Sequence, residues 1–136
     1  MSGKRVYDIE DRLIDFAVRI IKLAESLPKT LTGKHVSSQI LRSGTSPAPN
    51  YGEAHGAESN PDFIHKMKIC LKELRETRVW LIIISKSMLK PENKIELLLK
   101  ENEELISIFV ASIKTAKENR LKEERRRNER MSNHES

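Results

Sequence analysis

Residues 59–88, with the sequence SNPDFIHKMKICLKELRETRVWLIIISKSM, decide the fold expected of this chain. Ser59 or Asn60 can cap the start of a helix, and Pro61 fits its first turn. Asp62 follows Ser59 by three positions, as in a capping box. One apolar face then recurs at spacings of three and four over about seven turns, and it consists of Phe63, Met67, Cys70, Leu74, Thr77, Leu81, Ile84 and Met88. The stretch predicts a long amphipathic helix.

Three further amphipathic helices are expected around it. The first runs from about Asp8, a capping residue followed by acid in the first turn, to Leu27, where Pro28 ends it. A second begins near Thr32, and a last one starts near Pro91 and keeps an apolar face as far as Ala116. Strand alternation is nearly absent. The pattern predicts an all-α protein in which residues 1–116 form an antiparallel, up-down four-helix bundle.

Residues 42–53, RSGTSPAPNYGE, interrupt the second helix. Pro47 and Pro49 each remove a backbone donor, and both disfavour helical dihedrals in the residue before them. Propensity favours a break here, and a kinked helix that continues is the alternative. In a kinked helix the polar residues would share one face, and Glu73 and Glu76 of the 59–88 helix could meet Arg42 or Arg75. We interpret this polar set as a structural network for backbone groups freed by the prolines, with a ligand or RNA site as the alternative; it comprises Arg42, Ser43, Ser46, Asn50, Glu53, Glu73 and Glu76. Within it, Glu53 is a candidate partner of a buried arginine.

Charge gives the one lead to a partner. The 136 residues contain 25 Lys and Arg against 20 Asp and Glu, a net charge of +5. Lys68, Lys72 and Arg75 share one helix face, and Arg125, Arg126 and Arg127 lie together in the tail. Residues 117–136 form a charged tail without an apolar stripe, so we expect a frayed helix or disorder there. A basic stripe with a basic arm is the electrostatic footprint of RNA or DNA binding, and a merely solvated face is the alternative.

No pattern of residues points to catalysis, to a metal or to a cofactor. The pair Asp62 and His65 has no second copy, whereas di-metal bundles use two such pairs. Cys70 lies on an apolar stripe, no serine has a nucleophile-elbow pattern, and there is no Gly-rich phosphate loop. We therefore expect a protein that is not an enzyme. The first residues lack an apolar signal-peptide core and no apolar run approaches the length of a membrane span, so a cytoplasmic protein is expected.

The apolar run at residues 79–84, VWLIII, predicts an oligomer. Successive helix positions turn by about 100°, so six apolar residues cover every face of the helix. A single bundle buries only one stripe of each helix, and a second subunit is the expected cover for the outward side chains. The interface is expected to contain Val79, Trp80, Ile82 and Ile83.

Six blocks of sequence form a specific ordered pattern: YDIE at 7–10, QILRSGTS at 39–46, APNYGEA at 48–54, AESNPDF at 57–63, KELRET at 72–77 and SIKTAK at 112–117. In these blocks the chain resembles the four-helix bundle family of 23S rRNA-intervening sequence proteins. The resemblance implies that residues 42–53 stay helical and kinked, overriding the break, with Gly44, Ala48 and Gly52 permitting close helix approach. Pro47 and Pro49 depart from the commoner form of the motif.

The resemblance also implies a partner and an assembly. It suggests a homopentameric ring, and related bundles are accessory proteins of diversity-generating retroelements, where they associate with a reverse transcriptase and nucleic acid. The function expected is therefore a non-enzymatic, oligomeric interaction module that binds RNA or DNA. The alternative is a structural scaffold or accessory subunit for a protein partner such as a reverse transcriptase, without its own contact to nucleic acid.

Overall fold

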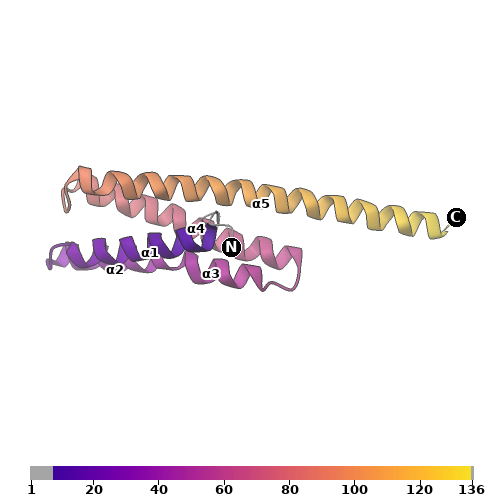
Figure 1. Ribbon diagram of the computed structural model, residues 1–136, viewed down its shortest axis with the longest axis horizontal. Coiled ribbons are helices and arrows are strands. Elements are labelled where there is room, and N and C mark those ends of the chain that lie inside the picture. Colours follow the sequence, from indigo (N-terminus) through magenta and orange to yellow (C-terminus); the bar gives the residue numbers. More distant parts are fainter. Residues whose placement is uncertain (1–7, 136) are drawn as a thin grey trace, which may run out of the picture.

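The computed structural model describes residues 8–135, which form helices joined by short turns (Figure 1). The helices are α1 (Ile9–Ser26), α2 (Leu31–Thr45), α3 (Pro47–His55), α4 (Asn60–Lys86) and α5 (Glu92–Glu135). None of the described residues belongs to a strand. The expectation of an all-α helical bundle is confirmed.

The helix starts follow the capping signals. The Asp8 carboxylate accepts a hydrogen bond from the backbone N–H of Asp11 at 2.8 Å at the start of α1. The Thr30 hydroxyl accepts from the N–H of Gly33 at 3.1 Å, so α2 begins one residue before the expected position. The Ser59 hydroxyl accepts from the N–H of Asp62 at 3.2 Å and caps α4. In each case the side chain satisfies a backbone donor that the helix leaves unpaired.

The proline-containing stretch kinks the second helix without breaking its path. Only Ser46 separates α2 from α3, and its dihedrals are helical (φ −64°, ψ −38°). The backbone N–H of Ser46 donates to the carbonyl of Arg42 at 3.1 Å, and the N–H of Asn50 donates to that of Ser46 at 3.3 Å. The break that propensity favoured is therefore wrong, because Pro47 takes the first position of α3, where its missing donor costs little. The kinked helix expected from the resemblance is confirmed.

Close approach of α2 to α1 depends on Gly44. A Cβ atom added there would lie 2.7 Å from Cγ2 of Ile20, well inside ordinary contact distance. Gly52 differs, since the nearest atom to such a Cβ is the Glu10 carboxylate at 4.0 Å. The expectation of close approach is thus confirmed at Gly44 and wrong at Gly52.

Figure 1 shows α1 and α2 side by side on one side of the bundle and α4 with α5 on the other, while α3 packs against α4. The core between them is filled by side chains with almost no exposed surface, among them Phe16, Ile20, Ile40, Met67, Leu74, Leu81, Leu105 and Phe109. Cys70 belongs to this core, and its burial raises the pKa of the thiol to about 12. Within the described residues no helix has the length and apolar character needed to cross a membrane.

The last part of α5 extends well beyond the bundle (Figure 1), and we call residues 117–135 the arm. Every side chain from Lys117 to His134 is exposed. The structure keeps this segment helical, where a frayed helix or disorder was expected. Its charges support the helix locally: Arg120 Nε lies 3.3 Å from Glu124 Oε1, a pair four residues apart on one face.

Candidate interaction surfaces

The outward face of α4 carries a continuous stripe that is basic in its first half and apolar in its second. Lys68, Lys72, Arg75, Val79 and Ile83 follow one another at spacings of four, three, four and four, and all are exposed. We call these five residues the outer stripe. Lys68, Lys72 and Arg75 therefore share a solvent-facing surface, as the spacing predicted.

The apolar run at 79–84 is covered only in part. Leu81 and Ile84 have no exposed surface, whereas Val79 is 51% exposed and Ile83 38% exposed. Trp80 is half-buried, and its Nε1 donates to the Glu76 carboxylate at 3.1 Å. The expectation that one bundle cannot bury the whole run is confirmed, because the helix turns these side chains through all directions. The second subunit expected over them stays a prediction.

A groove runs along the outside of α4 and α5. Leu71 and Arg75 of α4 line it together with Val110, Ile113, Lys114, Lys117, Glu118 and Leu121 of α5. A second hollow adjoins it, lined by Arg75, Val79, Ile106 and their neighbours. Sequence reasoning missed that Lys114 and Lys117 face Arg75. The signal was present, since Val110, Lys114, Lys117 and Leu121 follow helical spacing.

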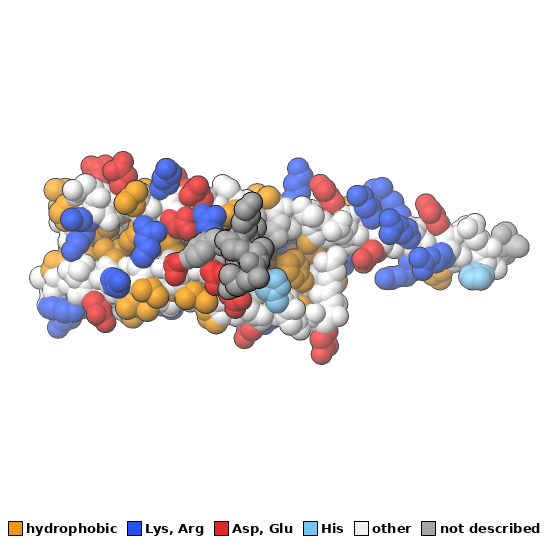
Figure 2. All heavy atoms as spheres, viewed as in Figure 1, with side chains coloured by type: hydrophobic (Ala, Val, Ile, Leu, Met, Phe, Trp, Pro, Cys, Tyr) orange, Lys and Arg blue, Asp and Glu red, His pale blue; other side chains and the backbone are white. Residues whose placement is uncertain are grey.

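A further apolar surface lies on α1, on the opposite side of the bundle. Ile14, Val18 and Ile21 are 47%, 43% and 39% exposed and sit at helical spacings of four and three. Leu41 of α2, which packs beside α1, is 41% exposed. Figure 2 shows apolar side chains along the edge of the bundle where α1 and α2 lie. The bundle thus exposes apolar side chains on two opposite faces, and the one on α1 was not anticipated.

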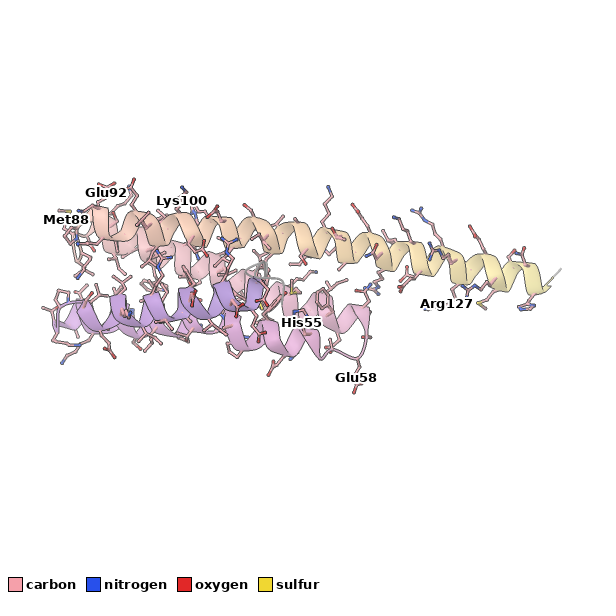
Figure 3. The ribbon with its side chains drawn as sticks, viewed as in Figure 1. His55, Glu58, Met88, Glu92, Lys100 and Arg127 are labelled. Atoms are coloured by element: carbon pink, nitrogen blue, oxygen red, sulfur yellow. The ribbon has the colours of Figure 1, made fainter. Side chains whose placement is uncertain are left out.

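The arginine triplet lies apart from the outer stripe. Arg125, Arg126 and Arg127 are exposed on the arm, and Figure 3 shows Arg127 beyond the bundle end that holds Glu58. Consecutive helix positions differ by about 100°, so the three side chains leave the helix in three directions. Arg126 and Arg127 line a shallow hollow with Arg130 and Glu123. The structure therefore gives two separate basic regions, one on the bundle and one on the arm.

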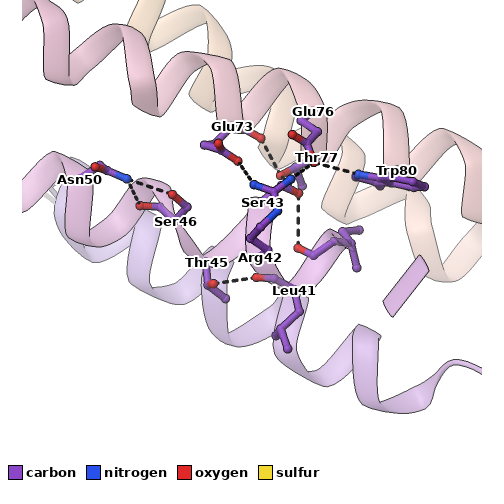
Figure 4. Close-up of polar contacts among 11 residues, drawn as sticks. Leu41, Arg42, Ser43, Thr45, Ser46, Asn50, Glu73, Glu76, Thr77 and Trp80 are labelled. Carbon is purple, nitrogen blue, oxygen red and sulfur yellow. Dashed lines mark hydrogen bonds and ion pairs between the residues drawn. The ribbon is translucent and has the colours of Figure 1, made fainter. Parts of the chain in front are cut away.

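The polar residues around the prolines form three small groups (Figure 4). In the first, the Arg42 guanidinium pairs with Glu73 at 2.9 Å and with Glu76. In the second, the buried hydroxyls of Ser43 and Thr77 lie 2.9 Å apart, and Thr77 donates to the Glu73 carbonyl at 2.8 Å.

The third group lies at the junction of α2 and α3. Asn50 Nδ2 donates to the Ser46 carbonyl at 3.0 Å and to its hydroxyl at 2.9 Å. All three groups tie the kink to itself or to α4, which favours the structural interpretation of these residues.

Glu53 does not belong to this network. Its side chain is 60% exposed, and its carboxylate lies 3.3 Å from Lys66 Nζ. Because Glu53 is exposed and no arginine among the described residues is its partner, the expectation of a buried pair at this position is wrong. Glu53 sits after the kink, on the exposed side of α3, where an ion pair of this type contributes little to stability.

Two polar contacts that sequence reasoning missed connect α5 to its neighbours. Arg12 of α1 binds Glu101 through two hydrogen bonds, Nη2 to Oε1 at 2.6 Å and Nε to Oε2 at 3.1 Å. The hydrogen bonds with Glu101 raise the pKa of Arg12 above its ordinary value. Asn102 has no exposed surface; its Nδ2 donates to the Leu74 carbonyl at 3.2 Å, while its Oδ1 is buried with no partner among residues 8–135. Neither partner could be found by spacing, because many positions on the partner helix have equivalent spacing and only the packing of the helices selects one.

Two of the histidines in the described segment, His35 and His55, take part in aromatic contacts. The ring of His35 meets the edge of Trp80 at 6.0 Å between centroids, and that of His55 meets Tyr51 at 4.5 Å. Across residues 8–135 no three His, Cys, Asp or Glu side chains gather in a way that could hold a metal ion. The candidate surfaces are the outer stripe, the groove, the apolar face of α1 and the arm.

Known proteins support this description. The model of a family described as 23S rRNA-intervening sequence protein matches residues 6–111. The chain is also similar to a crystal structure from Bacteroides thetaiotaomicron, of a protein with unknown function from the S23 ribosomal protein family. The two sequences are 36% identical, and the TM-score of the two structures is 0.75. That match covers 79% of this chain and 99% of the other. No curated protein matches the chain. The arm lies beyond the residues that the family model matches.

Proposed function

Because this chain belongs to the family of 23S rRNA-intervening sequence proteins, we propose that it is a non-enzymatic, oligomeric interaction module that binds nucleic acid, RNA or DNA, through a basic surface. A cytoplasmic location is part of this proposal, since its partner would be found there and the lone Cys70 is buried and free.

One observation supports the nucleic-acid part: five basic residues on the outside of α4 and α5 form no ion pair among the residues that the structure describes. Lys68, Lys72, Arg75, Lys114 and Lys117 form no ion pair within the described residues. Other bases do, since Arg12, Arg42, Lys66 and Arg78 each bind a carboxylate of the protein. An unpaired exposed base can neutralise a phosphate and release its counterion, which is the main source of affinity for nucleic acid.

The binding experiment is a salt titration. Fluorescence anisotropy with labelled RNA and DNA should give affinities that fall linearly with the logarithm of salt concentration, by about 0.7–0.9 for each phosphate contact. The variant K68A/K72A/R75A should weaken binding for every sequence and reduce this slope. K22A/K29A/K34A removes the same charge from exposed positions on the α1 and α2 side and should bind as the unmodified chain does. Equal losses in both variants would show that net charge, and not this surface, is responsible.

The assembly we propose is an antiparallel, up-down bundle that forms a homo-oligomeric ring. The exposed apolar residues on α1 and those on α4 form two different surfaces, and Figure 1 shows α1 on one side of the bundle and α4 on the other. Unlike surfaces that bind each other give a head-to-tail contact, which closes into a ring when the rotation between copies permits. Five copies are proposed on the family resemblance alone.

A second candidate function is favoured by the apolar part of the groove. Leu71, Val110 and Leu121 lie between the basic side chains of the groove, and a protein partner could cover these apolar residues better than phosphates could. In this alternative the chain is an accessory subunit of a partner such as a reverse transcriptase and does not itself contact nucleic acid. Salt-independent affinity for the purified partner, lost in V110E, together with no binding of RNA or DNA, would decide for this alternative.

A further inference from the structure

The arm is a helix that extends beyond the bundle, and no other part of the chain that the structure describes packs over it. All of its described side chains are exposed, and it begins after the residues that the family model matches. At about 1.5 Å per residue, the part from Lys117 to Asn133 is about 24 Å long. Figure 2 shows Lys and Arg side chains over much of its visible surface. A free helix of this length can enter a groove that the bundle itself could not.

One face of the arm is free of acids. Asn119, Lys122, Arg126, Arg130 and Asn133 follow one another at spacings of three, four, four and three, which places them on one side of the helix. We call these five residues the arm stripe. The four acids of the arm's first part, Glu118, Glu123, Glu124 and Glu129, all fall outside it. The arm stripe therefore presents Lys122, Arg126 and Arg130 without a carboxylate of its own, while Glu123 flanks it and lines a hollow together with Arg126 and Arg130.

The arginine triplet surrounds this face. Arg126 lies in the arm stripe, and Arg125 and Arg127 leave the helix about 100° to either side of it. A flat anionic surface could contact only one of these three arginines closely. A groove with an anionic wall on each side and hydrogen-bonding groups at its floor could contact all three.

The arm stripe lies on a different side of the helix from the one that faces the start of α4. Where the arm begins, Asn60 Nδ2 donates to the Ala116 carbonyl at 3.2 Å. The pocket between the start of α4 and the arm is lined by Ser59, Asn60, Pro61, Arg120, Glu123, Glu124 and Arg127. None of the arm stripe residues lines that pocket, so a groove can receive this face without a clash with α4.

We propose that the arm lies in the major groove of B-form duplex DNA, with Arg126 and Arg130 toward base edges and with Arg125 and Arg127 toward the phosphates of the two strands. The B-DNA major groove admits an α-helix, and Arg, Lys and Asn are the side chains that bind guanine and adenine edges there. The major groove of A-form RNA is too deep and narrow for side chains to read. This inference rests on the proposed function and names its ligand and its contact residues.

A swap variant tests the arm stripe without changing composition. The variant K122E/E123K/E129R/R130E exchanges Lys122 with Glu123 and Arg130 with Glu129. The net charge of the chain is kept, while two carboxylates enter the arm stripe. R120E/E124R is the matched control, because it reverses an ion pair outside the stripe and also keeps the charge. Circular dichroism should show equal helix content in both variants and in the unmodified chain.

The assay is fluorescence anisotropy with three probes of one sequence: a DNA duplex of about two helical turns, the matching RNA duplex and the single DNA strand. The unmodified chain and R120E/E124R should bind the DNA duplex most tightly. The swap variant should lose at least about tenfold in affinity for it, with a reduced salt slope.

Equal affinity of the swap variant and the unmodified chain for the DNA duplex overturns the inference. Tighter binding of the RNA duplex or of the single strand overturns it as well. If K68A/K72A/R75A abolishes binding while the swap variant retains it, the proposed function stands and the inference about the arm is wrong. If the unmodified chain binds none of the three probes, both are wrong.

Discussion

Substituting alanine at two helical glycines separates the effect of helix propensity from that of packing. Alanine in place of glycine in a helix interior stabilises by about 0.5–1 kcal/mol when the space is open. At Gly52 the nearest atom to an added Cβ is 4.0 Å away, so G52A should show this gain. At Gly44 the same Cβ would lie 2.7 Å from Cγ2 and 2.8 Å from Cγ1 of Ile20. Ile20 has no exposed surface and cannot turn aside.

Overpacking of a well-filled core costs about 1–3 kcal/mol, so G44A should be less stable than G52A by about that amount. Urea unfolding followed by circular dichroism at one fixed protein concentration measures this difference, and it corresponds to a midpoint shift on the order of 1 M. The cause is tested in an Ile20→Ala background, which itself costs about 2–5 kcal/mol but opens the space. There, adding G44A should restore stability. Equal stability of G44A and G52A in the unmodified background would refute the reasoning.

Four further outcomes are expected. Asn102→Leu should leave the free energy of unfolding unchanged or raise it, because it removes a buried oxygen without a partner. Arg12→Ala should cost about 1.5–3 kcal/mol by urea unfolding, whereas Glu53→Gln, at an exposed pair, should cost less than about 1 kcal/mol. The Cys70 thiol, with a pKa of about 12, should stay protonated and unreactive toward iodoacetamide near pH 8 and react only on unfolding, so fast labelling of the folded chain would contradict its burial. Native mass spectrometry should show several 15.7 kDa chains together, and Ile83→Lys should separate them without unfolding the bundle; a monomer of the unmodified chain at micromolar concentration would contradict the proposed ring.

Local signals were sufficient to predict the helices. Asp8 and Ser59 cap their helices as expected because capping depends only on neighbouring residues. The kink at Ser46 could not be derived from propensity, since both prolines argue for a break. It was predicted only through the family resemblance, and the structure shows why it is tolerated: the α2 hydrogen-bond pattern continues through Ser46 and Asn50.

Most ion pairs between side chains of different helices could not be predicted from the sequence. Arg42 with Glu73 and Glu76 could be named because those carboxylates face the kinked helix at regular spacing. Arg12 with Glu101 could not, because many acids along α5 have equivalent spacing and only the packing angle selects one. The exposed apolar row on α1 was also overlooked. A helix with one clear apolar stripe for the core is usually read as having a polar outer face, so the second apolar row was not looked for.

The uninterrupted course of α5 has a consequence for how strongly an assembly would hold a duplex. Because the same helix packs in the core and forms the arm, each copy fixes the direction of its arm. In a ring, the arms would then leave every copy at one constant angle and rise from one side. Contacts that are weak singly become strong when several are presented together at matched spacing, with gains of about 10²–10⁴ over one contact. A ring of this kind would discriminate long duplexes from short ones by avidity, since only a long duplex reaches more than one arm.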